Sequence, residues 1–209
     1  MSRITFILIS ILITSCVNQE NLSSVNELNQ IVEQVANKHN CKLTYEIFIS
    51  DEKTNPLNLT LHNSVDYTAT VGSIIEDCYL ELSKKNIYYD RYILKNNQGV
   101  LGIDISRKDL EKVLKCKPTA ERVIESLADK TFLSVATELD SVHFKPEQIE
   151  LMQKYCEEKF SGKVEHIGFE AATENGQLYC AYVAFIDTTF VGVTINLSKD
   201  NCKIFGISF

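Results

Sequence analysis

The C-terminal stretch from residue 163 onward constrains the fold most, because short apolar runs alternate there with turn residues. The stretches 163–171, 177–186, 190–197 and 202–209 have the composition and alternation of β-strands. Sequential strands joined by short turns form an antiparallel meander. Every second residue of the third stretch is aliphatic, which predicts that one face of the sheet packs on helices and the other is wetter. These residues are Val191, Val193, Ile195 and Leu197.

The rest of the chain alternates between helical and strand periodicity, which indicates an α+β protein. Helical spacing predicts helices over 24–39, 68–85, 106–115 and 146–160, and a further helix that begins at Pro118. Ser24 and Glu27 form a capping box at the start of the first helix. Alternating runs predict strands over 41–49, 57–61, 87–95 and 100–105, the last two joined by a turn at 96–99. We therefore expect helices packed on antiparallel sheets, with two helices before the C-terminal meander.

Lys117 and Pro118 mark the expected boundary between two parts of the chain. Proline suits the first turn of a helix and resists a position inside one. The sequence thus predicts an N-terminal α+β domain over 24–116 and a C-terminal α+β domain over 117–209.

The N-terminus carries the pattern of an export signal. Arg3 provides a positive charge, an apolar run follows over 4–13, and small residues end it. The run is too short to cross a bilayer as a helix, which takes about 20 residues. The sequence Ile13-Thr14-Ser15-Cys16 has the order aliphatic, small, small, cysteine, and it resembles the lipobox of bacterial lipoproteins.

This resemblance implies that residues 1–15 are a signal peptide cut between Ser15 and Cys16, and that Cys16 carries a diacylglyceryl group on its sulfur. In that family the new amine is usually acylated too, and two acyl chains already give stable anchoring at about 0.8 kcal/mol per buried CH₂. Residues 16–23 would then be the lipid anchor and a short polar tether. The body would be held at the cell membrane or the outer membrane, facing the periplasm or the exterior.

Three alternatives to the lipobox stay open. The segment could be an ordinary cleaved signal, or a single N-terminal anchor helix. A eukaryotic secreted protein is the third, because Asn21, Asn58 and Asn196 lie in glycosylation sequons. Such tripeptides arise often by chance in an Asn-rich chain.

The net charge of −7 argues against a nucleic-acid partner, whose binding requires clustered Lys and Arg. An apolar fraction of 44% and a charged fraction of 23% are typical of a folded globular protein. The expected partners are the lipid bilayer, through acylated Cys16, and an unknown envelope protein or small ligand. No cofactor is expected.

Six further cysteines permit up to three disulfides in an oxidising compartment, in any of 15 pairings. They are Cys41, Cys78, Cys116, Cys156, Cys180 and Cys202. The other interpretation is that they are small core residues, because Cys78 and Cys156 lie on apolar helical stripes. Their spacings are wide and include no CxxC pair, so no metal site is predicted.

The chain has none of the GxSxG, Walker A, GxGxxG or HExxH motifs. Asp140, Ser141 and His143 place the three residue types of a catalytic triad together, but the stretch is typical of a capped loop. His166, on a predicted strand, is the other acid–base candidate; a structural role is the simpler interpretation. His39 and His62 are scattered, and the acidic pairs Asp51 with Glu52, Glu76 with Asp77 and Glu157 with Glu158 indicate solvated faces or turns.

The order of two helices and a four-stranded meander over 118–209 is similar to the nuclear transport factor 2-like and cystatin-like cone folds. The helix PEQIELM, the Gly162-Lys163 strand start and the closing strand KIFGISF carry this similarity. It implies a sheet that curves around helices and that in some members encloses a pocket. It identifies no catalytic residue in this chain.

The sequence favours a non-enzymatic envelope lipoprotein that acts as a binding or interaction module. The alternatives are a ligand-binding protein or a hydrolytic or isomerase-type enzyme with a pocket in the C-terminal domain, and a structural spacer with a flat, self-complementary surface. A deep pocket with a buried His or carboxylate would favour the enzyme, and a filled interior would favour the module. Tyr88, Tyr89 and Tyr92 cluster on one predicted strand, which indicates a binding surface or simply strand propensity.

Overall fold

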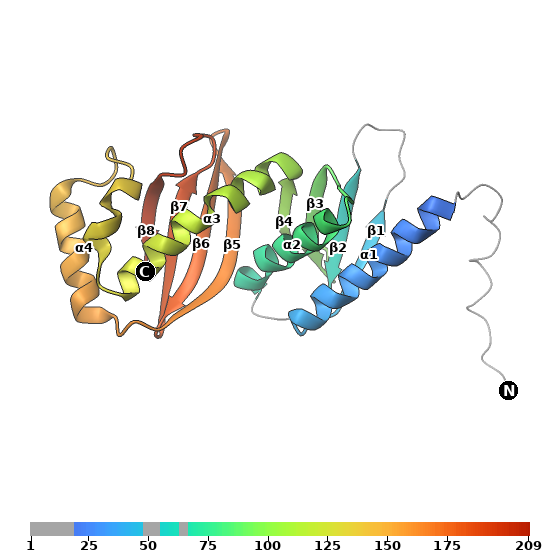
Figure 1. Cartoon of the computed structure of the whole chain (residues 1–209), viewed down its shortest axis with the longest axis horizontal. Coiled ribbons are helices and arrows are strands. Elements are labelled where there is room, and N and C mark those ends of the chain that lie inside the picture. The colour runs from blue at the N-terminus through green and yellow to red at the C-terminus, as the bar shows by residue number, and fades with distance from the viewer. Residues whose placement is uncertain (1–18, 48–54, 63–66) are drawn as a thin grey trace.

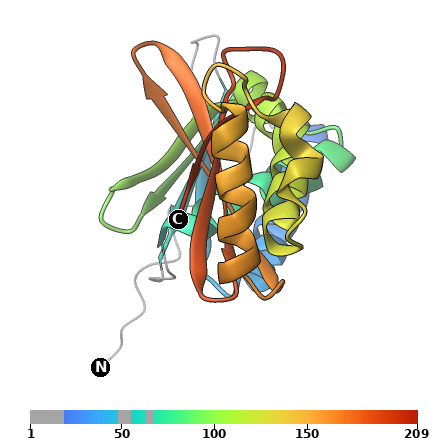
Figure 2. The same ribbon diagram turned by 90° about the vertical axis from the view of Figure 1, so that its left-hand side faces the viewer.

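The computed structural model describes residues 19–47, 55–62 and 67–209, which form two four-stranded sheets with helices on one side (Figures 1 and 2). The predicted α+β class is confirmed. The helices are α1 (Gln19–Lys38), α2 (Tyr67–Lys84), α3 (Arg107–Ala128), the 3-10 helix η1 (Phe132–Glu138) and α4 (Pro146–Lys159). None of the helices in these ranges is long and apolar enough to cross a membrane. Cys16, Ser15 and the acidic pair Asp51 and Glu52 lie outside the described residues.

The N-terminal sheet contains β1 (Leu43–Ile47), β2 (Pro56–Leu61), β3 (Arg91–Asn96) and β4 (Leu101–Ser106), in that spatial order. Strands β1 and β2 pair antiparallel, as do β3 and β4, but β2 and β3 are parallel. The prediction of purely antiparallel sheets is therefore wrong for this half. The reason is that α2 connects β2 to β3 as a crossover, which brings the chain back to the same end of the sheet.

The C-terminal sheet is the predicted meander of β5 (Val164–Glu174), β6 (Gln177–Ile186), β7 (Thr189–Asn196) and β8 (Ile204–Ser208). All of its pairs are antiparallel. The predicted inward row of β7 is fully buried, from Val191 to Leu197. The hairpin between β5 and β6 turns through Asn175 and Gly176, both in the left-handed region. This half therefore forms as its alternating pattern predicts.

Helix α3 links the two sheets (Figure 1). It follows β4 directly, with the Ser106 side chain accepting the backbone N–H of Asp109 as an N-cap, and it then packs across β6 and β7. The expected helix break at Lys117 and Pro118 is wrong, since Pro118 lies inside α3. Proline in a helix interior costs about 3 kcal/mol. Burial of the apolar face on both sides of Pro118, at Leu110, Val113, Ala120, Val123 and Ile124, offsets that cost.

Two further elements begin or end away from their predicted positions. Helix α1 begins at Gln19, so Ser24 lies within it and residues 19–23 of the expected tether are helical. Strand β3 begins at Arg91, so only Tyr92 of the three clustered tyrosines is in a strand. Tyr89 and Tyr92 are buried and pack edge to face, with ring centroids 6.3 Å apart. These tyrosines therefore belong to the core, and only Tyr88 is exposed, beneath the Arg107 guanidinium.

Candidate functional site

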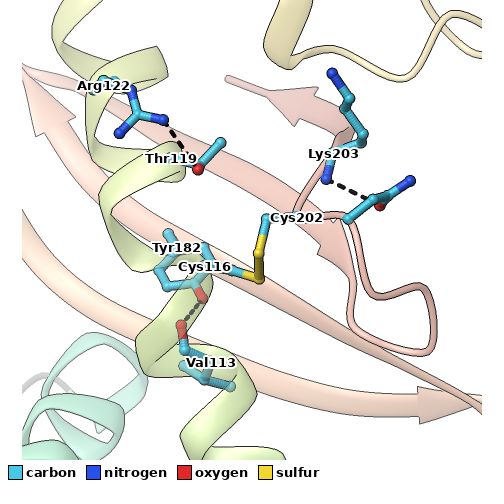
Figure 3. Close-up of a disulfide and its surroundings, with 8 residues drawn as sticks. Val113, Cys116, Thr119, Arg122, Tyr182, Cys202 and Lys203 are labelled. Atoms are coloured by element: carbon cyan, nitrogen blue, oxygen red, sulfur yellow. Dashed lines mark hydrogen bonds between the residues drawn. A yellow bond between two sulfur atoms is a disulfide. The ribbon is translucent and has the colours of Figure 1, made fainter.

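A disulfide joins α3 to the loop between β7 and β8 (Figure 3). It links Cys116 to Cys202, whose Cα atoms are 5.1 Å apart. Of the other candidates, Cys41, Cys78, Cys156 and Cys180 are free thiols. Burial raises the pKa of the thiols of Cys78 and Cys180, and it raises that of Cys156 to about 11. These three remain protonated and behave as core residues, as the alternative interpretation holds.

The Asp140, Ser141 and His143 stretch is a capped loop. The Asp140 carboxylate accepts the backbone N–H of Val142 at 2.9 Å, and this hydrogen bond is the main reason why the pKa of Asp140 lies below its ordinary value. Nδ1 of His143 lies 3.3 Å from Asp140, and its ring packs at a tilt of 55° against the Phe205 ring. Among the described residues no contact joins the Ser141 hydroxyl to His143, so the geometry of a nucleophile and its base does not form.

The other histidines are dispersed over the fold. Nε2 of His39 lies 2.6 Å from Asp77, and Nε2 of His62 lies 2.8 Å from the Thr44 hydroxyl. His166 is part of β5, and its side chain is outside the described set. Within the described ranges, no three His, Cys, Asp or Glu side chains gather as potential metal ligands.

The expectation that Glu76 and Asp77 form a solvated face is wrong. Their side chains are only 12% and 18% exposed, because α1 packs against α2 and the Lys117 side chain reaches Glu76 from α3. Glu76 pairs with Lys117 at 2.5 Å, and Asp77 pairs with Lys38 and His39. Partners distant in sequence therefore allow both carboxylates to be partly buried.

A small cavity lies beside this ion pair, between α2, α3 and the C-terminal sheet. It is lined by Ser73, Lys117, Glu121, Ile124, Gly168, Tyr182 and Val183 and has a volume of about 70 Å³. One water molecule occupies about 30 Å³ of the liquid, so the space suits water rather than an organic substrate. Side chains fill the surrounding interior, with Cys156, Phe160 and Cys180 almost fully buried.

The edges of the two sheets differ in how they are covered. Helix α2 packs against β5, and β5 in turn lies across a groove of about 240 Å³ from β4. The segment after η1 covers β8, because Leu139 bridges to Ile204 and the Asp140 N–H donates to the Ile204 carbonyl. Strand β1 is the fourth edge, and nothing among the described residues pairs with its outer side.

The register of β1 shows which of its backbone groups are free. The His62 N–H donates to the Lys42 carbonyl at 2.9 Å, so the backbone N–H and C=O groups of Lys42 point toward β2. Because this direction repeats at every second residue, the backbone groups of Thr44 and Glu46 also point toward β2. The backbone N–H and C=O groups of Leu43, Tyr45 and Ile47 therefore point to the open edge. An extended chain laid there could hydrogen-bond to them.

A groove lies along this same edge, between α1 and β1. Its volume is about 770 Å³, and it is lined by Asn29, Val32, Glu33, Ala36, Cys41, Lys42, Leu43, Thr44 and Tyr45. The Tyr45 hydroxyl donates to the Asn29 side chain at 2.8 Å and so fixes one wall. The groove thus combines free backbone groups, an apolar floor from Val32 and Ala36, and charged residues at its rim.

Comparison with protein-family models, with curated proteins and with solved structures finds no match to this chain. The candidate site therefore has to be judged on its own geometry. Sequence analysis did not identify the β1 edge, since alternation predicts a strand but not its position in a sheet. The charges of Lys42 and Glu46, on either side of Thr44, are the one sequence signal at this strand.

Proposed function

We propose that this protein is a lipid-anchored envelope protein that acts, without catalysis, as an interaction module through the open edge of β1. The observation that carries the interaction is that β1 has backbone groups with no partner among the described residues, beside a groove of about 770 Å³. Strand addition to such an edge is a common way to bind an extended segment of a partner. The cavity beside Lys117 has room only for water, which supports a module over a pocketed enzyme.

Anchoring at Cys16 is the second part of the proposal. It is supported by the resemblance of Ile13-Thr14-Ser15-Cys16 to a lipobox and by a disulfide between Cys116 and Cys202, a bond that persists in oxidising compartments. The sequons at Asn58 and Asn196 give the secreted eukaryotic alternative little support. Asn196 is only 4% exposed, and the Asn58 amide nitrogen is buried, so neither is available to carry a glycan.

Replacing Cys16 with Ser in the full chain tests the anchor. We expect the wild-type protein to fractionate with membranes and to take up a labelled fatty acid, and the C16S variant to do neither. Cys41→Ser is the matched control, because it also removes one unpaired cysteine but should keep both properties. Membrane attachment and lipid labelling that persist in C16S would refute the anchor.

Variants of the β1 edge test the interaction. Tyr45→Pro removes a free backbone N–H at the open edge and the hydroxyl that holds Asn29 in the groove wall, so it should abolish capture of a partner in envelope crosslinking. Proline at position 45 leaves the hydrogen bonds to β2 in place, since those come from Thr44 and Glu46. If a folded Y45P variant retained every crosslink of the wild type, the site assignment would be wrong.

A further inference from the structure

The open edge of β1 is complementary to itself, and this property selects a partner. Residues 42 to 46, from the position before β1 into the strand, read Lys-Leu-Thr-Tyr-Glu. When two copies of this segment are laid antiparallel with Thr44 at the centre, Lys42 lies opposite Glu46 of the second copy, and Glu46 opposite Lys42. Leu43 lies opposite Tyr45, and Thr44 lies opposite itself. Opposite charges directly across an antiparallel pair are stabilising.

We propose that β1 pairs with β1 of a second copy, so that two N-terminal sheets form one continuous sheet across a two-fold axis at Thr44. This deepens the proposed function, on which it rests, by naming the partner of the same edge. It requires no segment other than residues 42–46 of each copy.

The hydrogen-bond register allows this pairing. Leu43 and Tyr45 point their backbone groups outward, so Leu43 of one copy and Tyr45 of the other form a hydrogen-bonded pair. Lys42, Thr44 and Glu46 then fall on non-hydrogen-bonded pairs, where side chains lie closest. Their side chains are exposed in one copy, so both ion pairs form at the solvent-facing side of the joined sheet.

The groove provides the room that a second strand needs. Side chains of β1 alternate, so Leu43 and Tyr45 of the added strand would point to the same face as the groove between α1 and β1. There they would meet the apolar surface of Val32 and Ala36. Charges on an edge strand often prevent pairing with another strand. Here the two charges are opposite in sign and symmetric about Thr44, so they favour pairing with a second copy of β1 over pairing with the edge strand of another protein.

The symmetry also suits two anchors in one bilayer. A two-fold axis between antiparallel strands is perpendicular to the sheet, so both α1 helices lie on the same side of the joined sheet. Helix α1 begins at Gln19, three residues after Cys16, so the two helix N-termini that precede the body lie on one face of the dimer.

Disulfide trapping in native membranes tests the register. The full chain with Cys41→Ser and Thr44→Cys should form a disulfide-linked dimer under mild oxidation, because position 44 faces itself across the axis. Thr60→Cys in the same background is the matched control, since β2 is an inner strand, and it should remain monomeric. Co-expressed Lys42→Cys and Glu46→Cys chains should form a mixed dimer, whereas each alone should form little.

Charge reversal tests the energetics. Lys42→Glu and Glu46→Lys each replace two attractive pairs with two repulsive ones, so each should raise the dimer dissociation constant about tenfold, measured on the detergent-solubilised protein. The double variant restores opposite charges and should restore the wild-type constant. Equal crosslinking at positions 44 and 60, or a membrane-attached wild-type protein that is monomeric, would overturn the inference while leaving the anchor intact. Loss of anchoring in a protein that still dimerises would refute the anchor and not the pairing.

Discussion

Gly72 of α2 lies directly against the backbone of Phe169 in β5, and a Cβ built on Gly72 would stand 2.0 Å from the Phe169 carbonyl oxygen. Real Cβ atoms do not approach another atom this closely, so only glycine fits at this crossing. The contact joins a helix of the N-terminal half to the edge strand of the C-terminal sheet. It also covers that edge, whereas β1 has no partner on its outer side in the part of the chain that the structure describes.

Gly72→Ala should therefore destabilise the protein although alanine favours helices. The methyl group must push α2 away from β5, and overpacking of this kind costs about 3 kcal/mol. We expect a lower midpoint in urea denaturation followed by circular dichroism. Gly206→Ala is the matched control, because its Cβ would be 3.8 Å from the nearest atom, and its effect should stay below about 1 kcal/mol.

Reduction of the bond between Cys116 and Cys202 should destabilise the fold. The two residues are 86 positions apart, and closing a loop of that length in the unfolded chain corresponds to about 4.6 kcal/mol in the chain-entropy description. Adding a reductant should lower the urea midpoint of the wild type, but not that of a Cys116→Ser, Cys202→Ser variant. Thiol titration of the denatured, unreduced protein should count Cys41, Cys78, Cys156 and Cys180 as free, and a bond involving any of these would contradict the pairing.

Tyr182→Phe should weaken the attachment of α3 to the C-terminal sheet. The Tyr182 hydroxyl is buried and donates to the Val113 carbonyl, one turn before Pro118 (Figure 3). Removal of a buried hydrogen bond costs about 1 kcal/mol, to be measured by urea denaturation. Tyr179→Phe provides the comparison, since its hydroxyl reaches only Gln177 on the same strand, and it should have less effect. Equal losses of unfolding free energy in both variants would show that the hydrogen bond to Val113 is not the cause of the effect of Tyr182→Phe.

Local pattern was sufficient to predict the C-terminal meander, because alternation, turn residues and sequential order all indicate the same structure there. The same reasoning failed at Pro118. The local rule against proline inside a helix was outweighed there by burial of the apolar face of α3, and the sequence does not reveal the packing that buries it. It also missed η1, because a single 3-10 segment has no apolar period to detect.

The candidate site can be located only when it is known which strands pair with each other. Alternation predicted β1, but whether a strand is central or at an edge is decided by which strands lie beside it. The parallel pairing of β2 with β3 puts β1 outside, and it follows from the path of α2 rather than from β1 itself. In the same way, the pairing of Cys116 with Cys202 was one of 15 possibilities until the fold brought α3 beside the β7–β8 loop.

Asp77→Asn should reduce stability in a pH-dependent manner. Burial acts to raise the pKa of Asp77, but hydrogen bonds from Lys38 and His39 outweigh it, so the pKa lies below its ordinary value of 3.8. A carboxylate with a lowered pKa stabilises the fold at neutral pH, and this contribution is lost as the pH falls below about 4 through the folded-state value. The free energy of unfolding should therefore be lower in D77N than in the wild type at pH 7, and the two should converge toward pH 2. Glu158→Gln, at an exposed position of α4, should track the wild type at every pH, and a D77N deficit that stayed constant down to pH 2 would contradict the ion pair as its cause.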